Sequence, residues 1–368
     1  VPSSTVTHCQ RRIRLAAGLG PIGLDALLVS DLINVRYLTG FTGSNAALLV
    51  FGSGADPLLV TDSRYRTQAL RQAPDLETAI ERAGARHLMA RAVATGARRI
   101  GFESHVVTVD GFGALSGELA GHVGAELIPA PGVVEALREV KDADEVALVR
   151  SACGAADAAL AELLGNGGLR PGRTERAVAR ELESLMLDHG ADARAFETIV
   201  ATGANSAVPH HRPTEAVLRR GDFVKIDFGA MVDGYHSDMT RTFVLGAAAG
   251  WQRDVYDLVA AAQRAGVQAL ETGARLRDVD DAARQVIVDA GFGPNFGHGL
   301  GHGVGLQIHE APGINAAAAG TLPAGSVVTV EPGVYLPDRG GVRIEDTLLV
   351  GRRGPEQLTR FPKDLAIL

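Results

Sequence analysis

The hydrophobic and polar positions of residues 223–243 predict a β-hairpin in the second half of the chain. The stretch reads FVKIDFGAMVDGYHSDMTRTF, with two strand-like runs on either side of Asp233 and Gly234. These two residue types tolerate positive φ and are typical of a two-residue type I′ turn. With a turn of this length, Val232 faces Tyr235, and the register of the whole hairpin follows.

That register predicts that two acidic side chains lie together. It places Asp227 opposite Thr240 and Asp238 opposite Gly229. Because side chains alternate along a strand, Asp227 and Asp238 then share a face as diagonal neighbours, roughly 7 to 8 Å apart at the backbone. A surface hairpin with solvated acids is the alternative, but Asp227 lies inside an apolar run, where an unpaired carboxylate is costly. A metal or catalytic role is therefore a working hypothesis for this pair.

The pattern of residues 1–135 predicts an α/β domain, because strand-like runs alternate with helical stretches. Strands are expected at Ala26–Ser30, Ala46–Phe51, Pro57–Thr61 and Arg99–Glu103, and helices at Ser63–Gln72 and His87–Ala94. The stretch NVRYLTGFTGSN, residues 34–45, is rich in aromatic residues and glycine. We interpret it as a loop, either an ordinary connection or one that reaches towards a site.

A second domain is expected over residues 136–368, after a boundary near Pro131 and Gly132. Asp142, with Glu145 three residues later, forms a capping-box pattern that predicts the start of a helix. Apolar positions with helical spacing continue as far as the glycines of GNGG, which are expected to end this helix.

The second domain contains an internal repeat at an offset of 101 residues. The recurring positions are Leu169, Gly172, Arg176, Val178, Asp188 and Gly190, which return as Leu270, Gly273, Arg277, Val279, Asp289 and Gly291. Each copy reads as a glycine turn, an amphipathic helix and a glycine stop. The repeat predicts two halves related by a pseudo-two-fold axis, with the ligand site where they meet.

Length and charge limit the classes of function. With 368 residues the chain exceeds the usual size of a single core, which agrees with two domains. The formal net charge is −7, and lysine occurs only at Lys141, Lys225 and Lys363. Because the sequence has no basic cluster, we expect neither nucleic acid nor an anionic membrane as a partner.

Cysteine content and hydropathy predict a cytoplasmic protein. Cys9 and Cys153 are too few and too far apart for a disulfide framework or a thiolate metal site. No apolar run approaches the roughly 18 to 20 residues of a membrane span. The first residues also lack the apolar core of a signal peptide.

Histidines gather in two segments. HGLGHGVGLQIHE contains His298, His302 and His309, and its many glycines exclude a stable helix, so these side chains are expected on a strand or loop. NSAVPHHRP, ahead of the hairpin, contains His210 and His211, where an imidazole is able to donate to a developing oxyanion. A single histidine taken alone is more often a structural group.

Two further carboxylates follow apolar runs. SVVTVEPGVY is a continuous apolar strand that ends in Glu331, which the next proline forces into an extended conformation. GGVRIEDTLLV places Arg343 and Glu345 two positions apart, hence on one face of a strand.

Four carboxylates and one histidine form an oxygen-rich set. The acidic members are Asp227, Asp238, Glu331 and Glu345. Two divalent cations would neutralise their charge, and bridging carboxylates bring two cations close together. Such ligands suit Mn²⁺ and tolerate Co²⁺, Zn²⁺ or Fe²⁺, whereas the lack of thiolates argues against a structural zinc site. A water that bridges two cations becomes hydroxide near neutral pH, so the set predicts a hydrolase.

These clusters resemble those of the pita-bread metallopeptidases, the family of aminopeptidase P, prolidase and methionine aminopeptidase. The resemblance covers the chain from about Lys141 to its end. It implies five metal ligands, Asp227, Asp238, His302, Glu331 and Glu345. It also implies an oxyanion-stabilising histidine at His210, a substrate-contacting histidine at His309 and a further active-site histidine at His298. The first domain is similar to the creatinase-type domain of the proline-specific members.

The resemblance implies an Xaa-Pro peptidase, which cleaves between an N-terminal residue and proline. Glu331 would orient the nucleophile and relay its proton, while His210 and His309 stabilise the oxyanion and position the substrate. Arg343 would either hold Glu345 or bind the substrate carboxylate. The compact first domain favours dipeptides slightly over longer peptides, and the family implies a homodimer.

Two other functions are compatible with the same fold. A creatinase-like enzyme would hydrolyse a small guanidino compound without metal, and a catalytically silent binding protein would have broken ligands. The intact set of five ligands disfavours both.

Overall fold

The computed structural model describes residues 5–368, so the first four residues of the expected first domain lie outside the described part. The chain divides into two units between Arg138 and Glu139. The expected boundary at residues 135 and 136 lies inside a short helix, α6 (Val133–Arg138), which belongs to the first unit. Arg138 is buried there, and its Nη1 atom donates to the Asn34 Oδ1 atom at 2.9 Å.

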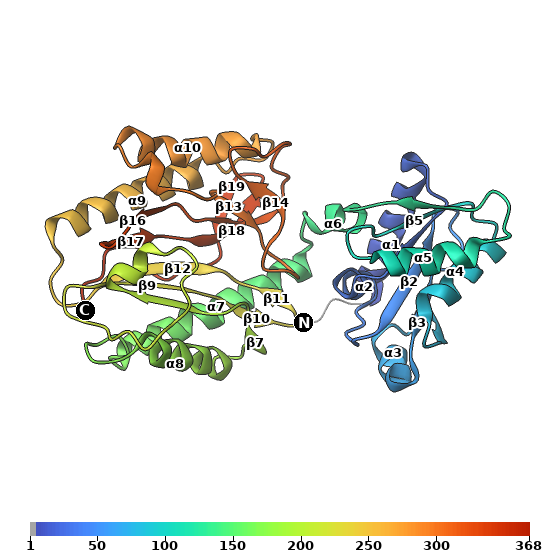
Figure 1. Ribbon diagram of the computed structural model, residues 1–368, viewed down its shortest axis with the longest axis horizontal. Helices are drawn as coiled ribbons and strands as arrows, with labels where there is room; N and C mark the ends of the chain where they lie inside the picture. The colour runs from blue at the N-terminus through green and yellow to red at the C-terminus, as the bar shows by residue number, and fades with distance from the viewer. Residues whose placement is uncertain (1–4) are drawn as a thin grey trace. The chain divides into compact units, whose positions relative to one another are not determined.

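The first unit is built on a mixed six-stranded sheet surrounded by helices (Figure 1). Its strands are β1 (Ala26–Val29), β2 (Ala46–Phe51), β3 (Leu58–Thr61), β4 (Glu77–Ile80), β5 (Arg99–Phe102) and β6 (Glu126–Pro129), in the order β4-β3-β2-β1-β5-β6. Its other helices are α1 (Thr5–Leu19), α2 (Leu32–Thr39), α3 (Arg66–Gln72), α4 (Gly84–Ala94) and α5 (Val109–Leu119). Buried aliphatic side chains of the sheet pack against α4 and α5 and form the core of this unit.

The four strands predicted for this unit are confirmed, but the loop predicted at residues 34–45 is wrong in its first half. The chain there forms α2. The Asp31 Oδ1 atom accepts from the Ile33 N–H at the start of this helix, and Gly40 ends it with a φ of 77°. An acidic N-cap and a glycine stop thus outweigh the aromatic and β-branched composition between them.

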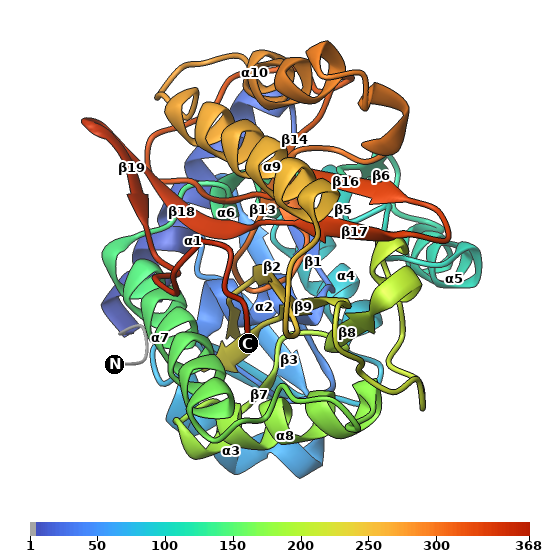
Figure 2. The ribbon, with the colours of Figure 1, turned by 90° about the vertical axis from the view of Figure 1, so that its left-hand side faces the viewer.

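The second unit places its strands between two pairs of helices. Figure 2 shows α9 and α10 on one side of the strands and α7 and α8 on the other. The helices are α7 (Ala143–Gly165), α8 (Glu175–Asp188), α9 (Gly250–Gln268) and α10 (Leu276–Asp289). The strands are β7 (Ala193–Arg194), β8 (Ile199–Thr202), β9 (Phe223–Phe228), β10 (Ala230–Val232), β11 (Tyr235–His236), β12 (Met239–Val244), β13 (Gly301–Gly303), β14 (Glu310–Ile314), β15 (Val327–Val330), β16 (Gly333–Leu336), β17 (Gly340–Arg343), β18 (Asp346–Gly351) and β19 (Gly354–Gln357).

Each helix pair has its own hydrophobic cluster. Side chains of α7 and α8 pack on β8, β9 and β12, whereas those of α9 and α10 pack on β15 to β18. The predicted capping box at the start of α7 is confirmed, because Asp142 and Glu145 each accept a hydrogen bond from the other's backbone N–H. Within residues 5–368, no helix is both long and apolar enough to cross a membrane.

The hairpin has the predicted register. Val232 pairs with Tyr235 and Asp227 with Thr240, and the turn residues Asp233 and Gly234 have φ values of 45° and 76°. The hairpin is divided into β9–β12 and β10–β11 by an irregular stretch at Gly229. A Cβ atom on this residue would overlap with a backbone carbonyl of the opposite strand, so only glycine permits this approach.

The predicted internal repeat is confirmed. Helices α8 and α10 have 14 residues each, and both their first and their last residues are 101 positions apart. The turns before them also match, because the Gly172 N–H donates to the Leu218 carbonyl at 3.0 Å and the Gly273 N–H to the Leu322 carbonyl at 2.8 Å. The second unit therefore contains two equivalent turn-and-helix motifs, one in each half of the repeat.

Candidate active site

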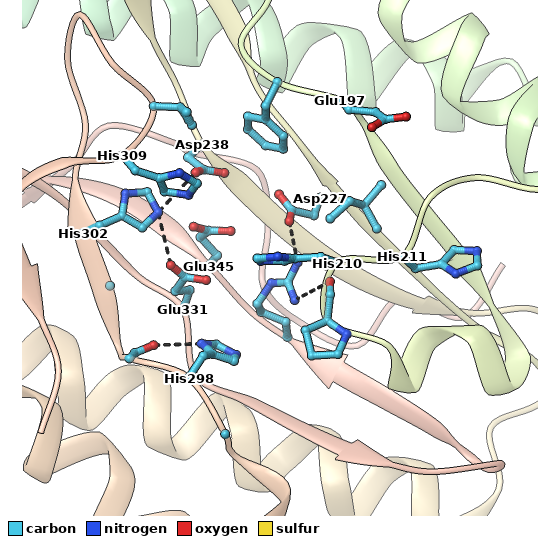
Figure 3. Close-up of a pocket in the computed structure, with 18 of the residues that line it drawn as sticks. Glu197, His210, His211, Asp227, Asp238, His298, His302, His309, Glu331 and Glu345 are labelled. Carbon is cyan, nitrogen blue, oxygen red and sulfur yellow. Dashed lines mark hydrogen bonds and ion pairs between the residues drawn. The ribbon is translucent and has the colours of Figure 1, made fainter. Parts of the chain in front are cut away.

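A cavity of about 780 Å³ lies in the second unit and is lined by residues from both halves of the repeat. All nine of the predicted site residues line it: His210, Asp227, Asp238, His298, His302, His309, Glu331, Arg343 and Glu345. Figure 3 shows that the labelled members of this set come from different strands and loops and lie around a common centre. The structure therefore brings together residues that are more than a hundred positions apart in the sequence.

The hairpin supplies two of the carboxylates. Val224, Ile226 and Phe228 of β9 point into the core beneath α7 and α8, so Asp227 faces the opposite side of the strand. Both Asp227 and Asp238 are buried, with exposed fractions of 7% and 5%. Burial of two acids on one face is costly unless cations or donors compensate for it.

His302 lies on β13, where its neighbour Gly301 allows the backbone to pass close to Thr329. The imidazole Nδ1 atom is 3.1 Å from the Gly303 carbonyl oxygen. Because a carbonyl can only accept, Nδ1 carries a proton and Nε2 is left to face the acids. The Nε2 atom lies 3.3 Å from Glu331 Oε1 and 3.6 Å from Asp238 Oδ2.

The remaining two carboxylates follow strands. Glu331 comes directly after β15, as predicted, whereas the single strand expected for Arg343 and Glu345 is two strands, with Glu345 between β17 and β18. The Glu345 Oε2 atom accepts a hydrogen bond from Thr240 Oγ1 at 2.6 Å. One ligand atom each from Asp238, His302 and Glu345 lies within 4.8 Å of the others.

The electrostatics of the site favour bound cations. Burial, together with the neighbouring carboxylates, raises the pKa of Asp238 and of Glu345 well above the ordinary values. Burial alone would also raise the pKa of Glu331, but the hydrogen bond and charge of His302 lower it to about 2. Glu331 in turn raises the pKa of His302 against the opposing effect of burial. The carboxylates thus repel each other, and a positive charge among them would relieve this repulsion.

The donor set fits divalent cations. Asp227 Oδ1 is buried and has no hydrogen-bond partner among residues 5–368, which leaves it available as a ligand atom. Four carboxylates and a neutral imidazole are hard oxygen and nitrogen donors of the kind that Mn²⁺ and its neighbours accept.

The other histidines occupy different environments. His298 Nδ1 is 2.8 Å from the Gly299 carbonyl oxygen, and its Nε2 is 2.8 Å from the Tyr335 hydroxyl. Burial lowers the pKa of His298, and the tyrosine donates to the unprotonated Nε2 atom. His309 stacks edge-on against His302, with ring centroids 4.4 Å apart.

The neighbours His210 and His211 point in different directions. His210 faces the acidic cluster, whereas the imidazole of His211 turns away from it (Figure 3). His211 Nε2 lies 2.8 Å from Glu175 Oε2, and Glu175 is fully buried. His211 is therefore a partner of a buried acid at the start of α8.

Arg343 is buried, and each of its side-chain nitrogens already has a partner. Nη2 donates to Asp227 Oδ2, Nε to Thr240 Oγ1 at 3.0 Å, and Nη1 to the Tyr335 hydroxyl at 2.8 Å. Thr240 and Tyr335 were not among the predicted site residues. Thr240 could have been identified from the sequence, because the hairpin register places it opposite Asp227 on the same face.

Comparison with known proteins identifies the families to which the two units are similar. Residues 147–352 match metallopeptidase family M24, and residues 11–140 match the creatinase/prolidase N-terminal domain. An uncharacterized peptidase of Bacillus subtilis, YqhT, is 38% identical over 353 residues, which cover 95% of this chain and 97% of that protein. The Xaa-Pro dipeptidase of Pyrococcus furiosus is 42% identical over 233 residues, 63% of this chain and 66% of the relative.

Solved structures are also similar to nearly the whole chain, and two serve as examples. The Xaa-Pro dipeptidase of Bacillus anthracis has a TM-score of 0.92 at 37% identity and covers 98% of this chain and 100% of that one. The X-Pro aminopeptidase of Thermotoga maritima has a TM-score of 0.87 at 33% identity and covers 97% and 100%. The expected fold, a creatinase-type domain followed by a pita-bread domain, is thereby confirmed. The chain belongs to metallopeptidase family M24.

Proposed function

We propose that this metallopeptidase uses two divalent cations to hydrolyse the peptide bond between an N-terminal residue and proline. The observation that carries the proposal is the single cavity into which the four carboxylates, His302 and three further predicted histidines face. The names of the similar proteins, which are Xaa-Pro dipeptidases and an X-Pro aminopeptidase, support the choice of substrate.

Five residues would hold the cations: Asp227, Asp238, His302, Glu331 and Glu345. Their mixture of oxygen ligands and one imidazole favours Mn²⁺. When bound, the cations would polarise the scissile carbonyl and lower the pKa of the attacking water.

The chain's own groups would handle the proton and the developing charge. Glu331, which lines the cavity beside His302, would take the proton of the water and pass it to the proline nitrogen. Burial, and then the charge of His302, lowers the pKa of His309, which keeps this ring neutral with one N–H to donate. His309 and His210 would donate to the carbonyl oxygen as it gains negative charge.

We favour a dipeptide over a longer peptide as the substrate. A dipeptidase must bind the free carboxylate of proline, and Arg343 is the candidate that the sequence predicted. To bind this carboxylate, Arg343 would give up one of its present hydrogen-bond acceptors. The longest of its side-chain hydrogen bonds joins Nη1 to the Pro209 carbonyl oxygen, at 3.3 Å. Arg212, which is exposed at the edge of the cavity, is the other cationic side chain there.

The test compares three substrates of the Mn²⁺-loaded protein: an Xaa-Pro dipeptide, its C-terminal amide and an Xaa-Pro-Yaa tripeptide. We expect kcat/KM to be at least about tenfold higher for the free dipeptide, because only this substrate places a carboxylate next to the proline ring. An Xaa-Ala dipeptide serves as the control for proline specificity.

If the tripeptide and the dipeptide were cleaved with equal kcat/KM, the protein would be an aminopeptidase and not a dipeptidase. Cleavage of none of the proline substrates would contradict the proposed function as a whole. The homodimer that the family resemblance implies stays a prediction, which light scattering of the purified protein tests.

A further inference from the structure

The three lysines of the chain, Lys141, Lys225 and Lys363, lie in the second unit, and each contacts a segment that leads to the cavity. The side chains of Lys141 and Lys225 are almost completely buried. Lys363 pairs with Asp346, the residue that follows the ligand Glu345. Each lysine therefore places a buried or half-buried amino group next to the neighbour of a predicted site residue.

Lys225 contacts the segment that carries His210. It lies on β9, two residues before Asp227, and its exposed fraction is 0%. Its Nζ atom donates to the carbonyl oxygens of Val208 at 2.7 Å and Pro209 at 3.3 Å, directly before the histidine. The same Nζ atom lies over the ring of Tyr335, 5.0 Å from the ring centroid.

Lys141 contacts the segment that carries His309. Its Nζ atom forms an ion pair with Glu310 Oε1 at 2.6 Å, and both side chains are at least 95% buried. Glu310 directly follows His309, and its other carboxylate oxygen accepts from the Gln307 N–H at 3.3 Å. The backbone of Lys141 is itself fixed, because its N–H donates to the Gly325 carbonyl at 2.9 Å.

Neither lysine lines the cavity, so neither is able to touch a substrate. A buried amino group without hydrogen-bond or ion-pair partners is costly, and each lysine therefore holds its partners in one arrangement. We propose that Lys225 and Lys141 are positioning residues, which fix the segments of His210 and His309 respectively in the geometry that the reaction needs. This inference rests on the proposed function for its kinetic test, but not for its test by hydrogen exchange.

The kinetic test is a crossed set of double-mutant cycles in the metal-loaded full-length protein. The single variants are Lys225→Met, Lys141→Met, His210→Ala and His309→Ala. Displacement of a catalytic group by about 1 Å costs up to a hundredfold in rate, so we expect each lysine variant to lower kcat by about tenfold to a hundredfold. KM and metal content should change little, because the five ligands are retained.

The matched and crossed double variants distinguish positioning from general damage. A lysine that acts through one histidine should have no further effect on kcat once that histidine is removed. We therefore expect Lys225→Met to leave kcat unchanged in the His210→Ala variant but to lower it fully in the His309→Ala variant. For Lys141→Met we expect the opposite: no further loss of kcat in His309→Ala and the full loss in His210→Ala. Leu182→Ala, which removes a fully buried side chain of α8, is the control and should combine multiplicatively with both histidine variants.

Hydrogen exchange gives a readout that does not depend on activity. Lys225→Met should accelerate exchange in residues 203–211 but not in residues 305–310, and Lys141→Met should do the opposite. Lys225→Gln keeps N–H donors for the two carbonyl groups and should accelerate exchange less. This variant replaces Lys225→Met in the experiment if the methionine variant does not fold. Exchange confined to the predicted segments would support positioning even in a protein that cleaves no Xaa-Pro peptide.

Two results would overturn the inference. One is multiplicative behaviour of each lysine with both histidines, which would mean that the lysines only stabilise the fold. The other is unchanged exchange in both segments despite loss of the lysine.

Discussion

Thr240 joins two charged groups of the cavity through one hydroxyl. Its Oγ1 atom donates to Glu345 Oε2 at 2.6 Å and accepts from Arg343 Nε at 3.0 Å. Arg343 in turn donates to Asp227, which lies on β9 directly opposite Thr240. A proposed ligand on one half of the repeat is thus connected to one on the other half through fully buried side chains. Groups that orient metal ligands in this way contribute to metal affinity although they do not touch the metal.

Replacement of this hydroxyl should weaken cation binding. In Thr240→Val the shape is almost unchanged, but Glu345 loses a donor, so we expect the affinity for Mn²⁺ to fall by about tenfold to a hundredfold. Calorimetric titration of the metal-free protein measures this. The matched control is Thr198→Val, because the Thr198 hydroxyl is buried with no partner among residues 5–368. Equal affinities of the two variants would show that Thr240 does not orient the ligand.

Metal loading should release protons. Burial and neighbouring acids raise the pKa of Asp238 and Glu345, so the metal-free protein retains protons at a pH where ordinary carboxylates have lost them. Cations bind ionised carboxylates, and binding must therefore expel these protons and weaken as the pH falls. Calorimetry in two buffers with different ionisation enthalpies detects the release. A heat of binding that is the same in both buffers would contradict it.

The acids among the proposed ligands stood out in the sequence because Asp227, Glu331 and Glu345 interrupt or follow apolar runs, and the hairpin register places Asp238 beside Asp227. The residues that orient them did not stand out. Thr240 has the high strand propensity of any threonine in a β-hairpin, and Tyr335 is an unremarkable strand residue, so only the three-dimensional structure identifies their partners. Lys225 was visible as a rare residue type, but its contacts with the His210 segment depend on how a long loop folds back.

At the level of secondary-structure elements, the two halves of the repeat begin with equivalent turns. Gly172 and Gly273 have φ values of 92° and 87°, and a Cβ atom on either would meet nothing within 4 Å. Only the backbone conformation therefore requires glycine at these positions. The equivalence explains why two helices so far apart in the sequence have the same length and the same turn before them.

Alanine substitution in these turns should have equal effects. Gly172→Ala and Gly273→Ala should each lower the free energy of unfolding by about 1 to 2 kcal/mol, the cost of a left-handed conformation for a residue with a Cβ atom. Gly154, an exposed position inside α7 with free space around it, is the matched control. Gly154→Ala should raise the free energy of unfolding by about 0.5 to 1 kcal/mol. Urea denaturation measures all three, and a clear difference between the two turn variants would argue against equivalent halves.

The sequence predicted those secondary-structure elements whose own residues determine their geometry. The hairpin register follows from a two-residue turn, which leaves no freedom for a slip. Helix α2 was missed because its composition is poor for a helix, and its capping residues Asp31 and Gly40 were not weighed against that composition.

At the level of the whole molecule, each unit has a separate hydrophobic core. The core of the first unit is formed by its sheet with α4 and α5, and those of the second by its two helix pairs. Because each of these three clusters lies within a single unit, each unit should fold without the other. Residues 5–138 and 139–368, expressed separately, are expected to unfold cooperatively on heating. A fragment that lacks a cooperative transition would contradict this independence.

The most direct measurement for the account as a whole is peptidase activity during metal titration. The protein is stripped of metal by a chelator, and hydrolysis of an Xaa-Pro dipeptide is followed while Mn²⁺ is added. The five proposed ligands and the orphaned Asp227 oxygen predict no activity at the start and a maximum at two cations per chain. Full activity of the stripped protein would contradict the account, as would a failure of Mn²⁺, Co²⁺ and Zn²⁺ alike to restore it.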